Sequence, residues 1–123
     1  MTKTKEQRYA DNEAYANTLR GRLGKLKQNA RGSAKKRGNA CELEYYDLRD
    51  LWAIQKGLCA YTGWPMELTS KSQRLVSLER IDNNLGYVKD NILLVCWCAN
   101  KARSGMSQDE FIEMCKAVSE THK

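Results

Sequence analysis

The stretch that decides the fold is LVSLERIDNNLGYVKDNILLVCWCANKAR, residues 75–103. Its first part predicts a short strand, because an apolar run ends on charged residues near Asp82. The sequence NNLG at 83–86 predicts a turn, since its glycine is free to adopt a positive φ. From Asp90 onward, apolar residues recur at three- and four-residue spacing, and this pattern predicts a helix of about three turns.

Polar side chains stand at both ends of this strand, loop and helix. Glu79 and Arg80 lie at the end of the expected strand, and Asn100 and Arg103 lie near the C-terminus of the expected helix. On such a frame the carboxylate of Glu79 can face the amide of Asn100. Oxygen ligands of this kind suit one hard divalent cation such as Mg²⁺, which usually keeps several waters and substrate phosphates in its shell. We therefore expect a cation site between Glu79 and Asn100.

The order of these residues resembles the His-Asn-His (HNH) endonucleases, the ββα-metal nucleases, and small phage-type members in particular. The resemblance covers roughly residues 50–115 and rests on Glu79-Arg80-Ile81-Asp82, Gly86-Tyr87, Asn91-Ile92, Cys96 and Asn100, with Gly57 to Gly63 similar to the hairpin that opens the motif. It implies an α+β fold with a ββα-metal core and flanking helices. It also implies that Glu79 and Asn100 bind Mg²⁺ or Mn²⁺ and that Asn91 braces the loop.

Arg80 departs from the family pattern, which has a His at this position as the general base on the attacking water. The chain has one His, His122, beside the C-terminus. A guanidinium stays charged near neutral pH and cannot take a proton from water, although it can hold a phosphate in a bidentate grip. Asp82, on the same face if the strand continues that far, is the nearest replacement base.

The leading hypothesis is a metal-dependent endonuclease that hydrolyses DNA phosphodiester bonds, with Glu79, Arg80, Asp82 and Asn100 as its catalytic residues. The missing His supports an alternative: a catalytically degenerate HNH fold that binds nucleic acid or inhibits a protein target, for instance a phage factor that blocks a host machine. RNA stays open as a ligand, because phosphate contacts carry little information about the sugar. In the simplest alternative, Glu79 and Arg80 are only a solvated surface pair.

The formal net charge of +6 is concentrated near the N-terminus. Residues 1–40 carry eleven Lys and Arg against three Asp and Glu, whereas residues 41–123 carry ten against twelve. We therefore divide the chain into a basic helical arm, 1–40, and an HNH-like domain, 41–123. A basic arm is typical of nucleic-acid binding, although such a run can also be only a solvated face. The expected nucleic-acid-binding residues are Arg20, Arg22, Lys25, Lys27, Arg31, Lys35, Lys36, Arg37 and Arg103.

Further elements are expected on both sides of the central stretch. Helical spacing of apolar residues predicts a long polar helix over 5–30, weakened by its two glycines, where a break or bend is open, with C-cap chemistry following at Gly38. A second helix is expected over 47–55. Residues 59–68 predict two short strands around a turn, which would pair with the strand of the central stretch. The sequence SQDE at 107–110 matches a capping box and predicts a last helix.

Five cysteines, an odd number, do not suit a disulfide framework and predict reduced thiols. A structural Zn²⁺ on Cys59, Cys96, Cys98 and a fourth ligand is the weaker alternative, because such a site needs four closed ligands; small buried thiols are favoured. No apolar run approaches the roughly 18–20 residues that span a bilayer, and no signal-peptide pattern is present. We expect a cytoplasmic protein without membrane contact, in the host cytoplasm if phage-encoded.

Overall fold

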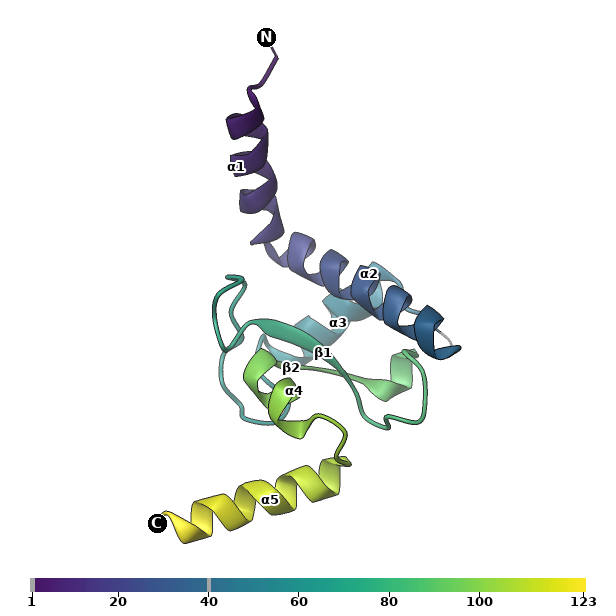
Figure 1. The fold of residues 1–123 in the computed structure, drawn as a ribbon, viewed down its shortest axis with the longest axis vertical. Helices are drawn as coiled ribbons and strands as arrows, with labels where there is room; N and C mark the ends of the chain where they lie inside the picture. The colour runs from purple at the N-terminus through teal and green to yellow at the C-terminus, as the bar shows by residue number, and fades with distance from the viewer. Residues whose placement is uncertain (1, 40) are drawn as a thin grey trace.

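The computed structural model describes residues 2–39 and 41–123, and within them the fold is α+β, as expected. The elements, shown in Figure 1, are α1 (Lys5–Ala16), α2 (Leu19–Arg37), α3 (Tyr45–Gln55), β1 (Val76–Arg80), a 3-10 turn (Lys89–Asn91), β2 (Ile92–Cys96), α4 (Trp97–Arg103) and α5 (Gln108–Thr121). The expected boundary between arm and domain falls at residue 40, which lies outside the described residues.

The two strands pair with each other, and α4 follows directly. β1 is antiparallel to β2, with Arg80 opposite Ile92. This arrangement corrects the helix expected from Asp90, because residues 92–96 form a strand and the helix begins only at Trp97. The sequence ILLVC is one continuous apolar run, and four of its five residues are buried. A short run of this kind has no periodicity that separates a buried strand from a buried helix.

The segment 59–68, expected to supply the partner of β1, forms no strand. The segment takes part only in isolated bridges, between Leu58 and Pro65 and between Glu67 and Leu75. Pro has no N–H to donate to a ladder, and glycine inside a strand weakens it. The pairing partner of β1 therefore comes from the C-terminal side, across the loop that contains the NNLG turn.

The helix expected over residues 5–30, with a break or bend at its two glycines, is two helices in the structure, and the break falls earlier, between Ala16 and Leu19. Thr18 starts α2, and its Oγ1 accepts a hydrogen bond from the backbone N of Gly21 at 3.0 Å. Such an N-cap residue has extended backbone angles and so interrupts a continuous helix. A Cβ at Gly21 would overlap the carbonyl oxygen of Tyr15, so glycine permits the sharp turn between α1 and α2. α2 ends at Gly38 in the left-handed conformation that its C-cap pattern predicts.

The two helices expected at 47–55 and after the capping box are confirmed. α3 starts slightly earlier, at Tyr45, and Glu44 at its N-cap donates its backbone N–H to the Asp47 carboxylate at 2.8 Å. In α5, the Ser107 hydroxyl accepts from the N–H of Glu110, and the Glu110 carboxylate accepts from the N–H of Ser107, each at 3.1 Å. These reciprocal bonds are the capping box predicted from sequence.

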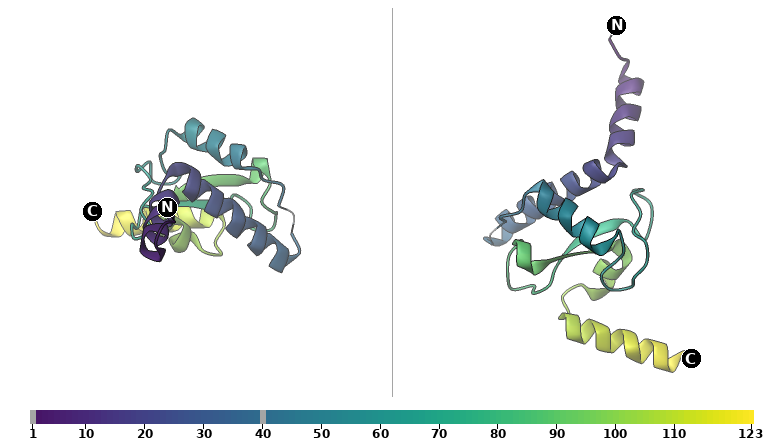
Figure 2. Two further views of the ribbon diagram at one scale, coloured as in Figure 1. Left: turned by 90° about the horizontal axis from the view of Figure 1, so that it is seen from above. Right: turned by 180° about the vertical axis from the view of Figure 1, so that it is seen from behind.

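The sheet lies between α3 and α4, and α2 runs along the β1 side (Figure 1, Figure 2). Leu23 of α2, Leu48 of α3 and Leu94 of β2 belong to one buried core. α5 joins it through Phe111, whose ring meets the Tyr61 ring edge-on with 5.3 Å between centroids. α1 extends away from the rest and has no buried residue. Thus α2, which carries eight of the eleven Lys and Arg of residues 1–40, contributes to the core through Leu23. None of the described helices is both long and apolar enough to cross a membrane.

Candidate functional site

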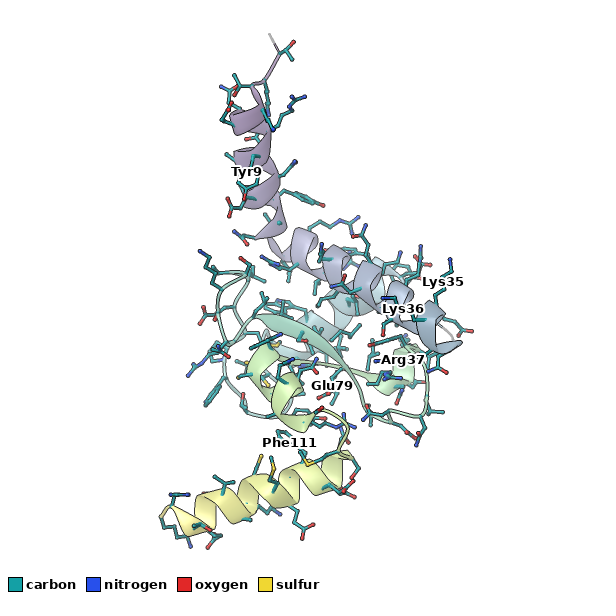
Figure 3. The ribbon with its side chains drawn as sticks, in the orientation of Figure 1. Tyr9, Lys35, Lys36, Arg37, Glu79 and Phe111 are labelled. Atoms are coloured by element: carbon teal, nitrogen blue, oxygen red, sulfur yellow. The ribbon has the colours of Figure 1, made fainter. Side chains whose placement is uncertain are left out.

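Glu79 is a buried carboxylate on the penultimate residue of β1, on the side that faces α4 (Figure 3). Only 5% of the residue is exposed, and its Oε1 lies 3.5 Å from Nη1 of Arg103. Its Oε2 is buried and has no hydrogen-bond partner among the described residues. Burial raises the pKa of Glu79, and the positive charge of Arg103 opposes that rise. A buried carboxylate oxygen without a donor is unfavourable, so a cation bound there would satisfy it.

Arg103 is an internal link between α4 and the end of β1. Its Nη1 donates to the carbonyl of Arg80 at 2.6 Å and to the hydroxyl of Tyr61 at 3.1 Å. Its Nη2 donates to the carbonyl of Ile81 at 2.9 Å, and its Nε donates to the carbonyl of Met106 at 2.8 Å. Only 1% of Arg103 is exposed. The expectation that Arg103 contacts nucleic acid is therefore corrected, because its guanidinium is used inside the protein.

Asn100 approaches β1 from α4. Its Nδ2 donates to the hydroxyl of Ser77 at 2.7 Å and to the carbonyl of Leu78 at 3.2 Å. Among the described residues, no donor bonds to its Oδ1. The two bonds fix the side chain against the strand, and the amide oxygen is left as a free acceptor of the kind that a hard cation binds.

A hollow of about 500 Å³ brings Glu79, Arg80 and Asn100 together. The chain around it comes from α2, β1, the loop after β1 and the end of α4; its lining is Arg37, Leu78, Glu79, Arg80, Asn83, Tyr87, Asn100, Ser104 and Gly105. Across residues 2–39 and 41–123, no three His, Cys, Asp or Glu side chains gather as a metal cluster. A Mg²⁺ or Mn²⁺ ion would accordingly take one carboxylate and one amide oxygen from the protein, a donor set that fits a cation which keeps waters and phosphate oxygens.

Arg80 supports the loop that follows β1. Its Nη1 donates to the carbonyls of Asn83 at 3.0 Å and of Leu85 at 3.1 Å. Its Cζ lies 5.3 Å from the centroid of the Tyr87 ring, within cation–π range. Arg80 thus lines the hollow while part of its guanidinium is engaged, and its remaining N–H groups are the ones left for a phosphate.

Asn91 joins the two ends of the loop between β1 and β2. It is 5% exposed, and its Oδ1 accepts from the backbone N of Asp82 at 2.9 Å. Its Nδ2 donates to the carbonyls of Asp82 at 3.1 Å and Gly86 at 3.0 Å. This is the geometry of a residue that braces a loop, which is the role that the resemblance implies for it.

Asp82 is not brought to the hollow that contains Glu79. β1 ends at Arg80, so the alternation of side chains along a strand does not extend to Asp82. The Asp82 carboxylate is exposed, and its Oδ1 accepts from the backbone N of Asn84 at 2.9 Å. It lines a separate hollow beside the first turn of α5. The structure therefore gives Asp82 a place in the loop and does not set it beside the candidate cation site.

Three of the basic side chains on α2 are held by neighbouring groups. The guanidinium carbon of Arg20 lies 3.6 Å from the centroid of the Tyr45 ring. Arg22 donates from Nε to the carbonyl of Leu68 at 2.8 Å, and it also reaches the Asn17 amide oxygen at 2.7 Å. Lys27 forms an ion pair at 3.2 Å with Glu44. These contacts dock α2 onto the rest of the chain, and the Glu44 carboxylate offsets the charge of Lys27.

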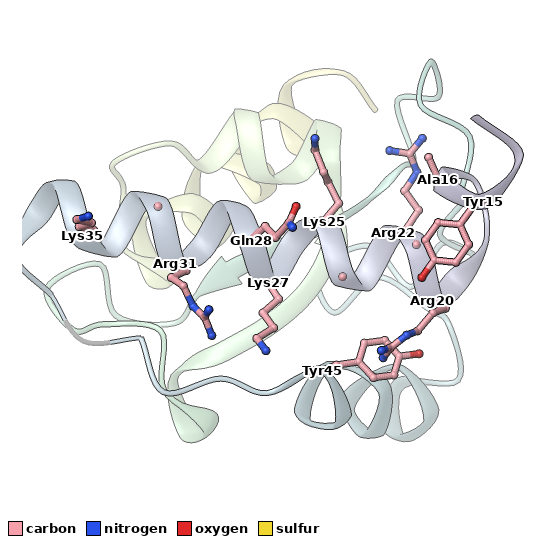
Figure 4. Close-up of a pocket in the computed structure, with 13 residues that line it drawn as sticks. Tyr15, Ala16, Arg20, Arg22, Lys25, Lys27, Gln28, Arg31, Lys35 and Tyr45 are labelled. Atoms are coloured by element: carbon pink, nitrogen blue, oxygen red, sulfur yellow. The ribbon is translucent and has the colours of Figure 1, made fainter. Parts of the chain in front are cut away.

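The other basic side chains of α2 face solvent. They form no ion pair among the described residues and comprise Lys25, Arg31, Lys35, Lys36 and Arg37. A hollow of about 800 Å³ runs along α2 toward the start of α3, and Arg31 and Lys35 line it (Figure 4). Arg37, labelled with Lys35 and Lys36 in Figure 3, lines the hollow beside Glu79 instead. The basic surface and the candidate cation site therefore meet at the C-terminal end of α2.

All five cysteines are free thiols, as expected. The buried Cys59 accepts hydrogen bonds at its Sγ from the backbone N of Cys96 at 3.2 Å and of Thr62 at 3.5 Å. Burial raises the pKa of Cys59, but hydrogen bonds from Thr62, Cys96 and Tyr61 outweigh it, and the pKa is lowered. Burial and the adjacent Cys59 raise the pKa of Cys96 to about 12. Cys59 and Cys96 hold the turn against β2.

Two residues that sequence reasoning missed position the site. Ser77 orients the Asn100 amide, and Tyr61 bonds both Arg103 and Gln108. A serine in a strand and a tyrosine in a turn carry no sequence signal of such a role, because each depends on a partner more than twenty positions away.

The chain has a relative in a bacteriophage. Over 86 residues it is 34% identical to an uncharacterised 29.0 kDa protein from the dda–modA intergenic region of Enterobacteria phage T4. The match covers 70% of this chain and 34% of the relative, so the chain spans about a third of that protein's length. No family model matches the chain. No solved structure matches it either.

Proposed function

We propose that this chain is a metal-dependent endonuclease of the HNH type, which hydrolyses DNA phosphodiester bonds. The observation that carries the proposal is the hollow in which Glu79 of β1 and Asn100 of α4 stand together, with Oε2 of Glu79 lacking a partner among the described residues. The order β1, β2, α4, with Asn91 bracing the loop between the strands, is the arrangement expected of a ββα-metal core.

Glu79 and Asn100 would hold one Mg²⁺ or Mn²⁺ ion through a carboxylate and an amide oxygen. When bound, such an ion polarises the scissile phosphate and stabilises charge on the leaving oxygen. Arg37 and the free N–H groups of Arg80 line the same hollow and suit phosphate oxygens. Ser77 keeps Asn100 in place, and Arg103 offsets the charge of Glu79 from inside the protein.

Weak activity is part of the proposal. A general base contributes typically about 10²–10⁴-fold, and the lining of the hollow contains no His, since Arg80 stands where the family has its base. Asp82 lines a different hollow, so its carboxylate does not stand beside a water molecule that attacks a phosphate at Glu79. The chain should therefore cut slowly, since electrostatic stabilisation survives the loss of the base.

A second candidate function rests on Arg80. Its bonds to the carbonyls of Asn83 and Leu85 show a side chain that serves the loop at the position where the family has its base. This observation favours a catalytically degenerate HNH fold that binds nucleic acid or inhibits a protein target. Where the second candidate binds nucleic acid, it uses the exposed basic residues of α2 as the endonuclease would, and the two then differ in whether the phosphodiester bond is broken.

A nicking assay on supercoiled plasmid separates the two. The purified chain should nick plasmid with Mg²⁺ or Mn²⁺ and stop when a chelator is added. Glu79→Gln keeps the shape of the side chain, and it should abolish nicking, as should Asn100→Ala. Glu67→Gln, which changes an exposed carboxylate outside the hollow, is the matched control and should cut normally. Arg80→His should preserve or raise activity. If Glu79→Gln cuts at the parent rate, or if no divalent metal supports cleavage by the parent, the endonuclease proposal fails and the catalytically degenerate fold takes its place.

A further inference from the structure

Two exposed indoles each carry a cation on one face of the ring. The guanidinium carbon of Arg74 lies 4.2 Å from the centroid of the Trp64 ring. The ammonium of Lys101 lies 5.6 Å from the centroid of the Trp97 ring. The rings are nonetheless open to solvent, with 44% of Trp64 and 41% of Trp97 exposed. Trp is enriched at binding surfaces, because its indole offers a large apolar face together with a polar N–H.

The segments that carry the two pairs lie against one another, because backbone contacts connect them. The backbone N of Trp97 donates to the carbonyl of Leu75, the residue after Arg74, at 2.8 Å. On the other side, the N–H of Cys59 donates to the carbonyl of Trp64 at 2.8 Å, and Cys59 in turn contacts the residue before Trp97. The turn at Trp64, the residues before β1 and the first turn of α4 thus lie against one another.

The cations of this surface retain their charge for a ligand. Among the described residues, neither Arg74 nor Lys101 forms an ion pair with a carboxylate. Flat rings stack on bases of any sequence, and basic groups beside them track the phosphate backbone. In duplex DNA the base faces are covered by their neighbours, so a stacking surface selects unpaired nucleotides.

This surface is adjacent to the candidate cation site. Trp97 and Lys101 are four residues apart and lie on one side of α4, and Asn100 lies within the same turn. A strand whose bases rest on the indoles would pass close to the hollow that Asn100 lines.

We propose that Trp64, Arg74, Trp97 and Lys101 form a stacking surface for single-stranded DNA. Unpaired bases stack on the exposed faces of the two indoles, and Arg74 and Lys101 contact the flanking phosphates. The inference deepens the proposed function and rests on it only for the position of the surface beside Asn100. Binding itself requires no metal, so it is measured separately from cleavage.

The test is fluorescence anisotropy of a labelled thymidine oligomer of about 12 nucleotides, a length within the usual range for one single-strand site. A chelator is present throughout, and an unlabelled duplex of equal length is measured in parallel. Trp97→Ala should weaken single-strand binding about fivefold or more, the low end of what one lost stacking contact costs. Trp97→Phe keeps a ring and should recover most of the affinity. Duplex affinity, supplied by the basic residues of α2, should change less than about twofold.

Matched variants guard against simple loss of structure. Tyr46→Ala removes an exposed aromatic ring from α3, away from the surface, and should bind the oligomer as the parent does. If the circular dichroism spectrum shows that Trp64→Ala is unfolded, the affinities of Arg74→Gln and Trp97→Ala for the oligomer test the proposal. Equal losses for oligomer and duplex, or no loss for either, would overturn the stacking surface. A parent chain that binds the oligomer normally but never nicks plasmid overturns the endonuclease alone.

Discussion

Replacing Arg103 with Met tests whether the guanidinium is the internal link described above. The Arg103→Met side chain fills similar space, but it removes donors from three backbone carbonyls and leaves the Glu79 carboxylate buried without its cation. Met is a flexible, apolar replacement, so the change isolates the polar contacts rather than creating a cavity.

The expected loss is about 3–5 kcal/mol in the free energy of unfolding, the usual cost of removing one partner from a buried pair. Hydrogen bonds to a charged group contribute about 1.5–3 kcal/mol each, but the four formed by Arg103 act as a unit and do not add. Against a typical total of about 5–15 kcal/mol, this loss removes a large share of the stability.

Urea unfolding followed by circular dichroism measures this loss. Lys101→Met makes the same chemical change at an exposed site on the same helix and should shift stability by less than about 0.5 kcal/mol. Arg103→Lys keeps the charge without the planar fork and should fall between the two. A loss below about 1 kcal/mol in Arg103→Met would refute the internal link.

The pH dependence of the same variant identifies the source of the loss. Burial already raises the pKa of Glu79, and without Arg103 that pKa rises further. A carboxyl whose folded pKa lies above its unfolded pKa destabilises the protein at high pH, and this penalty disappears as the pH falls through the folded pKa. The difference in free energy of unfolding between Arg103→Met and the parent should therefore become smaller from about pH 8 to about pH 5. A difference that is constant or widens would mean that the lost carbonyl bonds, and not the orphaned carboxylate, dominate.

Three further predictions use other parts of the chain. Asn91→Ala should lower the free energy of unfolding by about 1–3 kcal/mol in urea, because backbone groups of Asp82 and Gly86 lose the side chain that joins them. Changing Lys25, Arg31 and Lys35 together to Gln should reduce the slope of log affinity for duplex DNA against log salt by about 0.9 per lost phosphate contact; an unchanged slope would remove them from the interface. Hydrogen bonds from the backbone and side chain of Ser107 lower the pKa of Glu110, so its stabilising effect is present above the unfolded pKa and lost as pH falls through the folded one. Glu110→Gln should consequently lose stability at neutral pH and little in strong acid, as thermal melting would show.

Local backbone chemistry made several elements predictable from sequence. Gly38 ends α2 because a left-handed residue costs glycine nothing, and the Ser107 capping box starts α5 because the bonds join residues three apart. The strand at 92–96 was not predictable in this way. Whether ILLVC is helix or strand depends on pairing with β1, which is a tertiary contact, and its pattern fits either.

The site was predictable only where position along the chain determines geometry. Glu79 and Asn100 come together because a strand end and the following helix pack on each other, which the resemblance already implies. Arg103 shows that a basic residue cannot be assigned to a binding surface from its charge alone. It lies three residues after Asn100 on the same helix, and its side chain is buried rather than exposed to a ligand. The prediction that Asp82 lies on the same face as Glu79 was wrong, because β1 ends two residues before Asp82.

The lack of buried residues in α1 determines how much its sequence can vary. No side chain of α1 contributes to the core, and the helix start is secured by Thr4 and Gln7, which bond each other's backbone N–H groups at 3.1 and 2.8 Å. Substitutions along its faces therefore change stability little, so selection for folding exerts little pressure there. Leu23 of α2, fully buried a few residues later, has no such freedom. Among related chains, amino-acid differences should therefore be much more frequent before Thr18 than after it.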